Sequence, residues 1–207
     1  MGQMLDRSTK DQRPIGDVAM EPKELMAEAV RLARESVDKG WGGPFGAIIA
    51  RNGEIVARGQ NRVLLTGDPT AHAEVETIRK AVQMLNPEAP SISEEHQNES
   101  TLQYVPRPEG SPDLVPERAR MLRGCSIYIS GAPCPMCMSA IYWSRLDEVY
   151  FSCDMEYTRR IGFDDSFQYE DFQKPLDQRR IKIQQIYPEL GARAYEAWSH
   201  RVNHHAY

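Results

Sequence analysis

Cys134 and Cys137 are separated by two residues in the stretch SGAPCPMCMSAIYW, which spans residues 130–143. This spacing is compatible with a redox dithiol, with half of a structural zinc site, or with part of a catalytic metal centre. On the first turn of a helix both thiols lie on one face, where the positive end of the helix dipole favours their thiolates. Residues elsewhere in the chain must show which of these three kinds of site is present.

A structural zinc ion needs two further Cys or His ligands. His200 and His204 are four residues apart, but they follow Cys137 at a far longer interval than the roughly 12 to 15 residues of a zinc finger. Cys125 begins an expected strand and Cys153 ends another, and small buried thiols are commoner than ligands at such places. We interpret the two histidines as solvated tail residues.

His72-Ala73-Glu74 offers a third ligand of another kind. Together with Pro133-Cys134-Pro135-Met136-Cys137, it forms the His-x-Glu and Pro-Cys-x-x-Cys signature of zinc deaminases. Three protein ligands leave the fourth tetrahedral position for water, whose pKa zinc lowers to about 7. Glu74 need not bind the metal and is free to take the water's proton and deliver it to a substrate. The combination favours catalytic zinc, with a non-catalytic zinc-stabilised domain as the alternative.

The composition favours a soluble domain that acts on a small molecule. A chain of 207 residues with 41% hydrophobic residues can bury one sizeable core. Its net charge of -5 argues against phosphate-tracking contacts with nucleic acid. The sequence has no apolar run of about 18 residues, and its start lacks the apolar core of a signal peptide. We therefore expect no membrane contact and a cytoplasmic location, where four cysteines are thiols or metal ligands.

Helical and strand patterns alternate along the chain. Apolar spacing predicts a helix from Glu21 that Gly40 ends, and two strands that meet at a tight turn at Asn52-Gly53. Further helices are expected at 71–85, 134–145 and 192–202, and strands at 44–50, 54–60, 124–130, 147–153 and 181–187. This alternation favours an α/β sandwich built on a mixed sheet.

Two segments are expected to lie outside the packed core. Residues 1–20 are polar and aperiodic, which predicts a flexible N-terminal arm. Residues 86–120 contain six of the 14 prolines, and this composition predicts a Pro-rich surface insertion. We interpret the insertion as a mobile loop in preference to a functional lid. The remainder of 21–207 is predicted to be a single domain.

Several stretches of the sequence resemble a known protein superfamily. GGPFGAIIARNGEIVARGQN, DPTAHAEVETIRKA and APCPMCMSAIYWSR are similar to the cytidine-deaminase-fold superfamily, and GFDDSFQYEDFQKP resembles bacterial guanine deaminases. The similarity covers roughly residues 22–86 and 121–207. It implies a three-layer α/β/α sandwich with a five-stranded mixed sheet and one zinc ion per subunit. It also implies a homodimer in which the C-terminal segment is exchanged or closes the partner's site.

The resemblance also implies roles for individual residues. His72, Cys134 and Cys137 correspond to the zinc ligands, Glu74 to the proton shuttle, and Asp165 to a second proton shuttle associated with loss of the amino group. The implied substrate contacts are Asn61, which hydrogen-bonds the base, Phe45, Ala73, Trp143 at the pocket wall, and the terminal Tyr207.

Each of these positions also has an ordinary structural interpretation. Asn61 suits a turn after a strand, and Asp165 suits a helix cap together with Asp164. Trp143 on a helix is compatible with core packing, and Tyr207 is a chain end, where mobility is usual.

The expected reaction is zinc-dependent hydrolytic deamination of guanine to xanthine and ammonia, as in purine salvage or catabolism. Guanosine, cytosine and ammeline remain alternative substrates for the same residues. A transfer-RNA adenosine deaminase and a non-catalytic zinc-stabilised binding module are less favoured. Ala132 departs from many relatives, which have Glu before Pro-Cys, and the tail His-Ala-Tyr also differs from theirs.

Overall fold

The fold is described from a computed structural model, which covers residues 19–85 and 121–200. The predicted N-terminal arm lies outside these ranges except for its last two residues. The predicted insertion at 86–120 and the terminal Tyr207 lie outside them entirely.

A β-hairpin forms the first half of the sheet. Strands β1 (Gly46–Arg51) and β2 (Glu54–Gln60) pair antiparallel. Asn52 and Gly53, which connect them, have φ values of 53° and 78°. Positive φ at both central residues is what a two-residue type I′ turn requires, and Asn-Gly is its preferred sequence. The turn predicted from the sequence is therefore present.

The second half of the sheet makes it mixed. Strand β3 (Ser126–Gly131) pairs antiparallel with β1, and β4 (Glu148–Cys153) pairs parallel with β3. Within the described ranges this gives one four-stranded sheet of order β2-β1-β3-β4. The predicted α/β class with a mixed sheet is confirmed.

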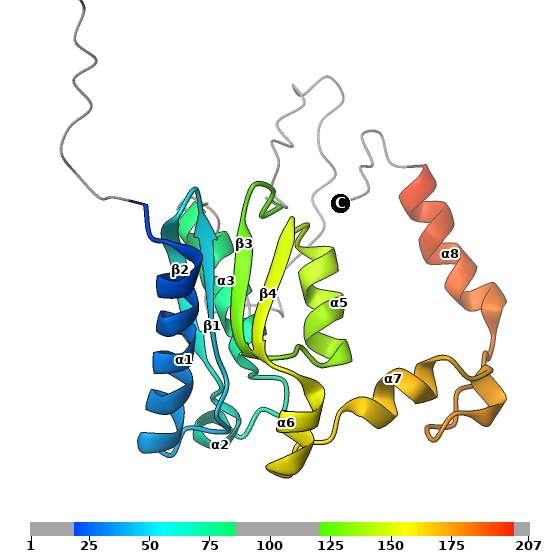
Figure 1. The fold of residues 1–207 in the computed structure, drawn as a ribbon. Coiled ribbons are helices and arrows are strands. Elements are labelled where there is room, and N and C mark those ends of the chain that lie inside the picture. The colour runs from blue at the N-terminus through cyan, green and yellow to red at the C-terminus, as the bar shows by residue number, and fades with distance from the viewer. Residues whose placement is uncertain (1–18, 86–120, 201–207) are drawn as a thin grey trace, which may run out of the picture.

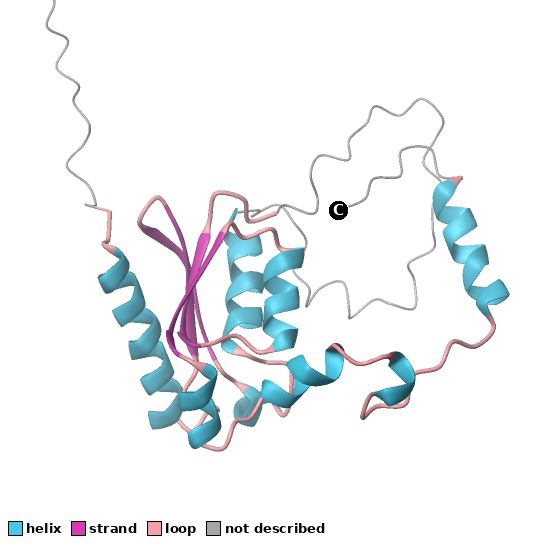
Figure 2. Ribbon diagram, turned by 45° about the vertical axis from the view of Figure 1, so that its right-hand side comes forward, coloured by secondary structure: helices cyan, strands magenta, loops and turns pink. Residues whose placement is uncertain are grey.

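Three long helices cover the two faces of this sheet (Figure 1). Helix α1 (Pro22–Asp38) lies on one face, while α3 (Ala73–Leu85) and α5 (Pro135–Trp143) lie beside each other on the opposite face, as Figure 2 shows. The two apolar clusters follow this division, and strand side chains alternate between them. Ile48 packs with the α1 residues, whereas Ile49 packs with residues of α3 and α5.

Short helices connect and extend these layers. Helix α2 (Val63–Thr66) lies between β2 and α3, and α6 (Met155–Arg160) follows β4. The chain then continues through α7 (Ser166–Phe172), the 3-10 helix η2 (Leu176–Gln178) and α8 (Pro188–Ser199), which lies apart from the sheet (Figure 1). None of the helices described combines the length and apolarity needed to cross a membrane.

The expected fifth strand at 181–187 is wrong. This segment forms no strand, and its apolar side chains are exposed, with Ile181 at 75% and Ile186 at 66%. A strand exists only where its backbone groups pair with a neighbour, and here the chain has already left the sheet edge through α6 and α7. The hydrophobic pattern that suggested a strand therefore remains without a buried face in the single chain.

Gly46 allows α1 to pack directly against β1. A Cβ atom built at Gly46 would lie 2.3 Å from the backbone oxygen of Ala29 and 2.4 Å from the backbone nitrogen of Ala33. Both of these are helix backbone atoms, which cannot move aside as a flexible side chain can. The Gly46 N–H also donates a hydrogen bond to Ser130 Oγ over 3.1 Å, which ties the start of β1 to the neighbouring strand β3.

We expect Gly46→Ala to lower the free energy of unfolding by about 1–3 kcal/mol, because the added methyl group overpacks this contact. Urea denaturation followed by circular dichroism measures the change. Gly191→Ala is the matched control, because its Cβ would meet open space in α8 and alanine favours helix. Equal stability of Gly46→Ala and the unaltered protein would contradict this packing.

Candidate active site

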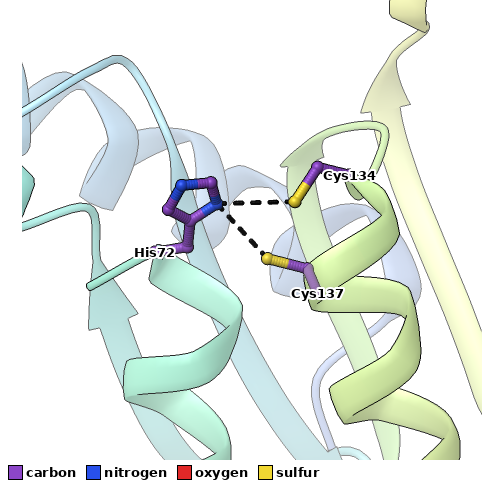
Figure 3. Close-up of side chains that lie close together, drawn as sticks. All are labelled: His72, Cys134 and Cys137. Carbon is purple, nitrogen blue, oxygen red and sulfur yellow. Dashed lines mark hydrogen bonds between the residues drawn. The ribbon is translucent and has the colours of Figure 1, made fainter. Parts of the chain in front are cut away.

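Three predicted metal ligands meet where α3 and α5 begin. The sulfur of Cys134 lies 3.6 Å from His72 Nδ1, and the sulfur of Cys137 lies 3.4 Å from it (Figure 3). All three ligand atoms lie within 4.8 Å of one another. Ligands about 2.0–2.3 Å from a tetrahedral zinc ion lie about 3.5–3.8 Å apart. The chemistry and spacing of this donor set therefore fit zinc.

The local structure of α5 presents both thiols on one side. Cys134 is the N-cap residue, in extended conformation with φ -70° and ψ 167°, and Pro135 stands at the first helical position. Proline suits this position because its missing N–H would be unpaired there anyway. Cys137 follows within the first turn and is fully buried.

Hydrogen bonds favour the thiolate form of one of the two cysteines. Hydrogen bonding from Cys137, followed by that from His72, lowers the pKa of Cys134 to about 4. The same contact raises the pKa of Cys137, because its proton is shared with the neighbouring thiolate. A coordinated metal ion would deprotonate both thiols. The pKa of His72 is raised, first by its hydrogen bond with Cys134.

Glu74, the second residue of α3, is a buried acid beside these ligands. Its exposed fraction is 5%, and burial is the main cause that raises its pKa to about 6. A carboxyl group with a pKa near the working pH is suited to both accepting and returning a proton. Ala73, in contrast, is packed in the apolar cluster on the α3 side of the sheet and does not line the cavity described next.

A cavity of about 260 Å³ opens beside the ligand cluster. Several predicted site residues from separate parts of the chain line it, and Ala132 is also at its wall. The predicted residues at the cavity are Phe45, Asn61, His72, Glu74, Cys134 and Asp165. The volume is smaller than the roughly 300–1,000 Å³ of pockets for drug-sized ligands, so it suits a single heterocycle.

Asn61 is held in one orientation at this cavity. Its backbone N–H donates to Phe45 O over 2.9 Å, and its carbonyl accepts from the buried Ser36 hydroxyl over 2.8 Å. Its side-chain Oδ1 accepts from the Val63 N–H at 3.2 Å, so the turn role suggested by the sequence is present as well. A Cβ at Gly42 would lie only 2.0 Å from this Oδ1. Because Oδ1 is already engaged, the amide NH₂ is the group left to donate to a ligand.

Two phenylalanines form an aromatic wall. Phe45 and Phe163 meet edge to face, with ring centroids 5.2 Å apart and an interplanar angle of 86°. Gly43 lies against both rings, since a Cβ there would be 2.8 Å from Phe45 and 3.0 Å from Phe163. Phe163 was missed in the sequence-based interpretation, although it belongs to the GFDD segment and precedes Asp165 by two residues.

The two acids of the GFDD segment have different tasks. Asp164 Oδ1 accepts hydrogen bonds from the backbone N–H and the hydroxyl of Ser166, the first residue of α7. Asp165, the N-cap residue of α7, makes no side-chain capping bond and lines the cavity. Burial, followed by the charge of Cys134, raises the pKa of Asp165.

Among the described residues, two predicted substrate contacts, Ala73 and Trp143, do not line this cavity. Trp143 is the last residue of α5, is 62% exposed and lies near the Arg145 guanidinium, 6.0 Å from the ring centroid. It does not line the cavity of its own chain. Tyr207 lies outside the described residues.

Comparison with known proteins agrees with this geometry. Residues 20–153 match the family model of the cytidine and deoxycytidylate deaminase zinc-binding region. Guanine deaminase of Bacillus subtilis (strain 168) is 36% identical over 91% of this chain and 100% of its own length. A crystal structure of guanine deaminase from Bacillus subtilis superposes with a TM-score of 0.72, covering 91% of this chain and 99% of that chain.

A second type of relative is similar over a shorter span. The tRNA-specific adenosine deaminase of Aquifex aeolicus (strain VF5) is 32% identical over 60% of this chain and 60% of its own length. The match to guanine deaminase extends further along the chain, and it covers the GFDD region as well as the metal-ligand cluster. The chain therefore belongs to the zinc-binding cytidine and deoxycytidylate deaminase family, as a homologue of guanine deaminase.

Proposed function

We propose that this protein catalyses the hydrolytic deamination of guanine to xanthine and ammonia. The observation that carries the proposal is the convergence of Glu74 and Asp165, both with raised pKa values, on one cavity beside the His72 and Cys134 ligand atoms. The 36% identity to a guanine deaminase over 91% of the chain supports the choice of base.

His72, Cys134 and Cys137 would hold one zinc ion per subunit. When bound, zinc supplies a Lewis acid that lowers the pKa of water to about 7. Glu74 takes a proton from the attacking water and delivers it to a ring nitrogen of the base. The second proton comes from the hydroxyl group that has formed on the ring carbon; Glu74 or Asp165 passes it to the departing amine, which leaves as ammonia. Water and guanine are thereby converted to xanthine and ammonia without an oxidant or reductant.

The cavity explains how a base would be held for this reaction. The Asn61 NH₂ group donates to an acceptor atom on the base edge, and Phe45 with Phe163 contacts its apolar face. A site for a free base needs no basic surface, which agrees with the net charge of -5. The same charge disfavours a transfer-RNA substrate, and a simple binding module would not need a buried Glu74.

We expect Glu74→Gln to lower kcat for guanine by about 10²–10⁴-fold, because the amide cannot accept and return the proton. Ammonia release by metal-loaded protein gives the rate, and elemental analysis gives the zinc content, which we expect to be unchanged. Glu76→Gln on the same helix, where the carboxylate pairs with Arg79, is the control and keeps normal turnover. Near-full activity of Glu74→Gln with zinc retained would refute the role of Glu74.

Guanine and guanosine differ in whether a ribose must fit beside the base. Because the relative that matches 91% of this chain is a guanine deaminase, we expect kcat/KM for guanine to exceed that for guanosine by at least about 100-fold. Parallel ammonia-release assays with guanine, guanosine, cytosine, adenine and ammeline measure this preference. Comparable turnover of guanosine would reassign the substrate while leaving the reaction class intact.

A homodimer is the assembly that we propose. Large apolar side chains remain exposed on β4, α7 and α8, including Phe151 at 49%, Phe172 at 55% and Leu190 at 56%. Large apolar side chains that stay exposed in this number favour an interaction site. A second copy that covers it would bury these residues, and its C-terminal segment would close the neighbouring site. We assign Trp143 to the wall of the partner's cavity, because it does not reach its own.

Subunit complementation tests this assignment. We expect Trp143→Ala to lower kcat/KM by about tenfold or more, as for a central interface aromatic, and a mixture of Trp143→Ala with Glu74→Gln subunits to regain activity. In the mixed dimer, one cavity combines an intact Glu74 with the Trp143 of the other chain. Absence of recovery after refolding the mixture, or a monomer by analytical ultracentrifugation, would contradict the exchange.

We also propose that the reaction belongs to purine metabolism in the cytoplasm. Cys125, Cys134, Cys137 and Cys153 are free thiols, and a reducing compartment preserves the two that would bind zinc.

A further inference from the structure

Helix α7 carries Asp165 at its N-terminal boundary, and two polar contacts hold this helix near the ligand cluster. We propose that Gln168 and Tyr169 are positioning residues: Gln168 orients the Asp165 carboxylate, and Tyr169 ties α7 to the segment that leads into the metal ligands. This inference rests on the proposed deaminase function and on the role of Asp165 as a proton shuttle. It assigns tasks to two residues that have none in the proposed mechanism.

The surroundings of α7 leave its position dependent on specific contacts. The helix spans only Ser166–Phe172, and isolated helices of this length are not stable in water. Its aromatic side chains are partly exposed, with Phe167 at 36% and Phe172 at 55%. Burial of an apolar stripe therefore does not locate α7 in the chain, and directional hydrogen bonds become the main constraint on Asp165.

Tyr169 supplies the contact to the ligand segment. Its hydroxyl donates to the Pro133 carbonyl over 2.9 Å. Pro133 immediately precedes Cys134, the N-cap of α5, so its carbonyl lies outside the hydrogen-bond ladder of that helix. A partly buried carbonyl needs a donor from elsewhere, and Tyr169 provides it from a residue 36 positions later. One hydrogen bond thus fixes α7 relative to the start of α5.

Gln168 supplies the contact to the acid itself. Its side-chain Nε2 donates to Asp165 Oδ1 over 3.1 Å, and its backbone N–H donates to the Asp165 carbonyl over 3.1 Å. With Oδ1 engaged, Oδ2 is the oxygen that remains to exchange a proton in the cavity. An amide orients the carboxylate without adding a positive charge beside it.

The far end of α7 is braced by its own loop. Asp171 accepts from Lys174 Nζ over 3.0 Å and from the Arg180 backbone N–H over 3.1 Å. The guanidinium of Arg180 also lies over the Phe167 ring, 4.4 Å from its centroid. These contacts join residues 167–180 to one another, whereas the Tyr169 hydroxyl joins them to the ligand segment.

The test uses Tyr169→Phe, which removes only the hydroxyl, in the full-length, metal-loaded protein. We expect kcat for guanine to fall by about tenfold, the equivalent of one lost hydrogen bond, with KM within about twofold and zinc content unchanged. Amide hydrogen exchange in 166–172 should become faster. The matched control is Tyr157→Phe, an exposed tyrosine on α6 whose ring packs with Arg160, and it should change none of these quantities.

A second variant tests the orientation of the acid. Gln168→Met keeps the length of the side chain but removes the amide donor, and we expect a similar fall in kcat. On an Asp165→Asn background, both Tyr169→Phe and Gln168→Met should lose their effect on kcat, because the group they position no longer transfers a proton. Gln173→Met, at the exposed end of α7, controls for the substitution itself.

The outcomes separate this inference from the proposed function. Wild-type kcat in Tyr169→Phe and Gln168→Met, or an undiminished effect on the Asp165→Asn background, overturns the positioning role. Normal kcat in Asp165→Asn overturns the role of Asp165 in the proposed function instead. If the wild-type protein releases no ammonia from guanine, the proposed function fails, and unchanged exchange of 166–172 in Tyr169→Phe would still refute the tether.

Discussion

The site depends on the parallel placement of two helix starts on one face of the sheet. Helices α3 and α5 lie side by side there, and His72 directly precedes α3 while Cys134 caps α5. This arrangement brings an imidazole nitrogen to within 3.6 Å of two sulfur atoms that are more than 60 positions away in the chain. The positive ends of both helix dipoles also meet at this point, which favours the anionic thiolates.

The same packing raises the pKa values of the neighbouring carboxyl groups. Glu74 follows His72 by two positions, so the turn of α3 that presents the imidazole to the cysteines also places a buried carboxyl group at the cavity. Burial raises its pKa toward neutrality. Asp165 reaches the cavity from outside the sheet, on a helix held by polar contacts, and its pKa is raised by a smaller degree of burial together with Cys134.

The C-terminal third differs from the rest of the chain in how little of its apolar surface is buried. Up to β4, apolar side chains face a core shared by the sheet and helices α1, α3 and α5. Beyond it, apolar residues such as Ile181, Leu190 and Tyr195 are exposed, with Tyr195 at 78%. Such a segment buries little apolar surface within the single chain, so its hydrophobic residues are not explained by a core of its own. Trp143, the last residue of α5, is exposed as well.

The sequence by itself determined the elements whose signals are local. Asn52-Gly53 predicted the hairpin, Gly40 predicted the end of α1, and the His-x-Glu and Pro-Cys-x-x-Cys spacing predicted the ligand set, because turn geometry and helical spacing depend on neighbouring residues. Only the tertiary structure decided that residues 181–187 form no strand, that Asp164 bonds to Ser166 while Asp165 lines the cavity, and that Phe163 joins Phe45 in its wall. These outcomes depend on which distant backbone or side chain lies opposite, and periodicity within one segment carries no information about that partner.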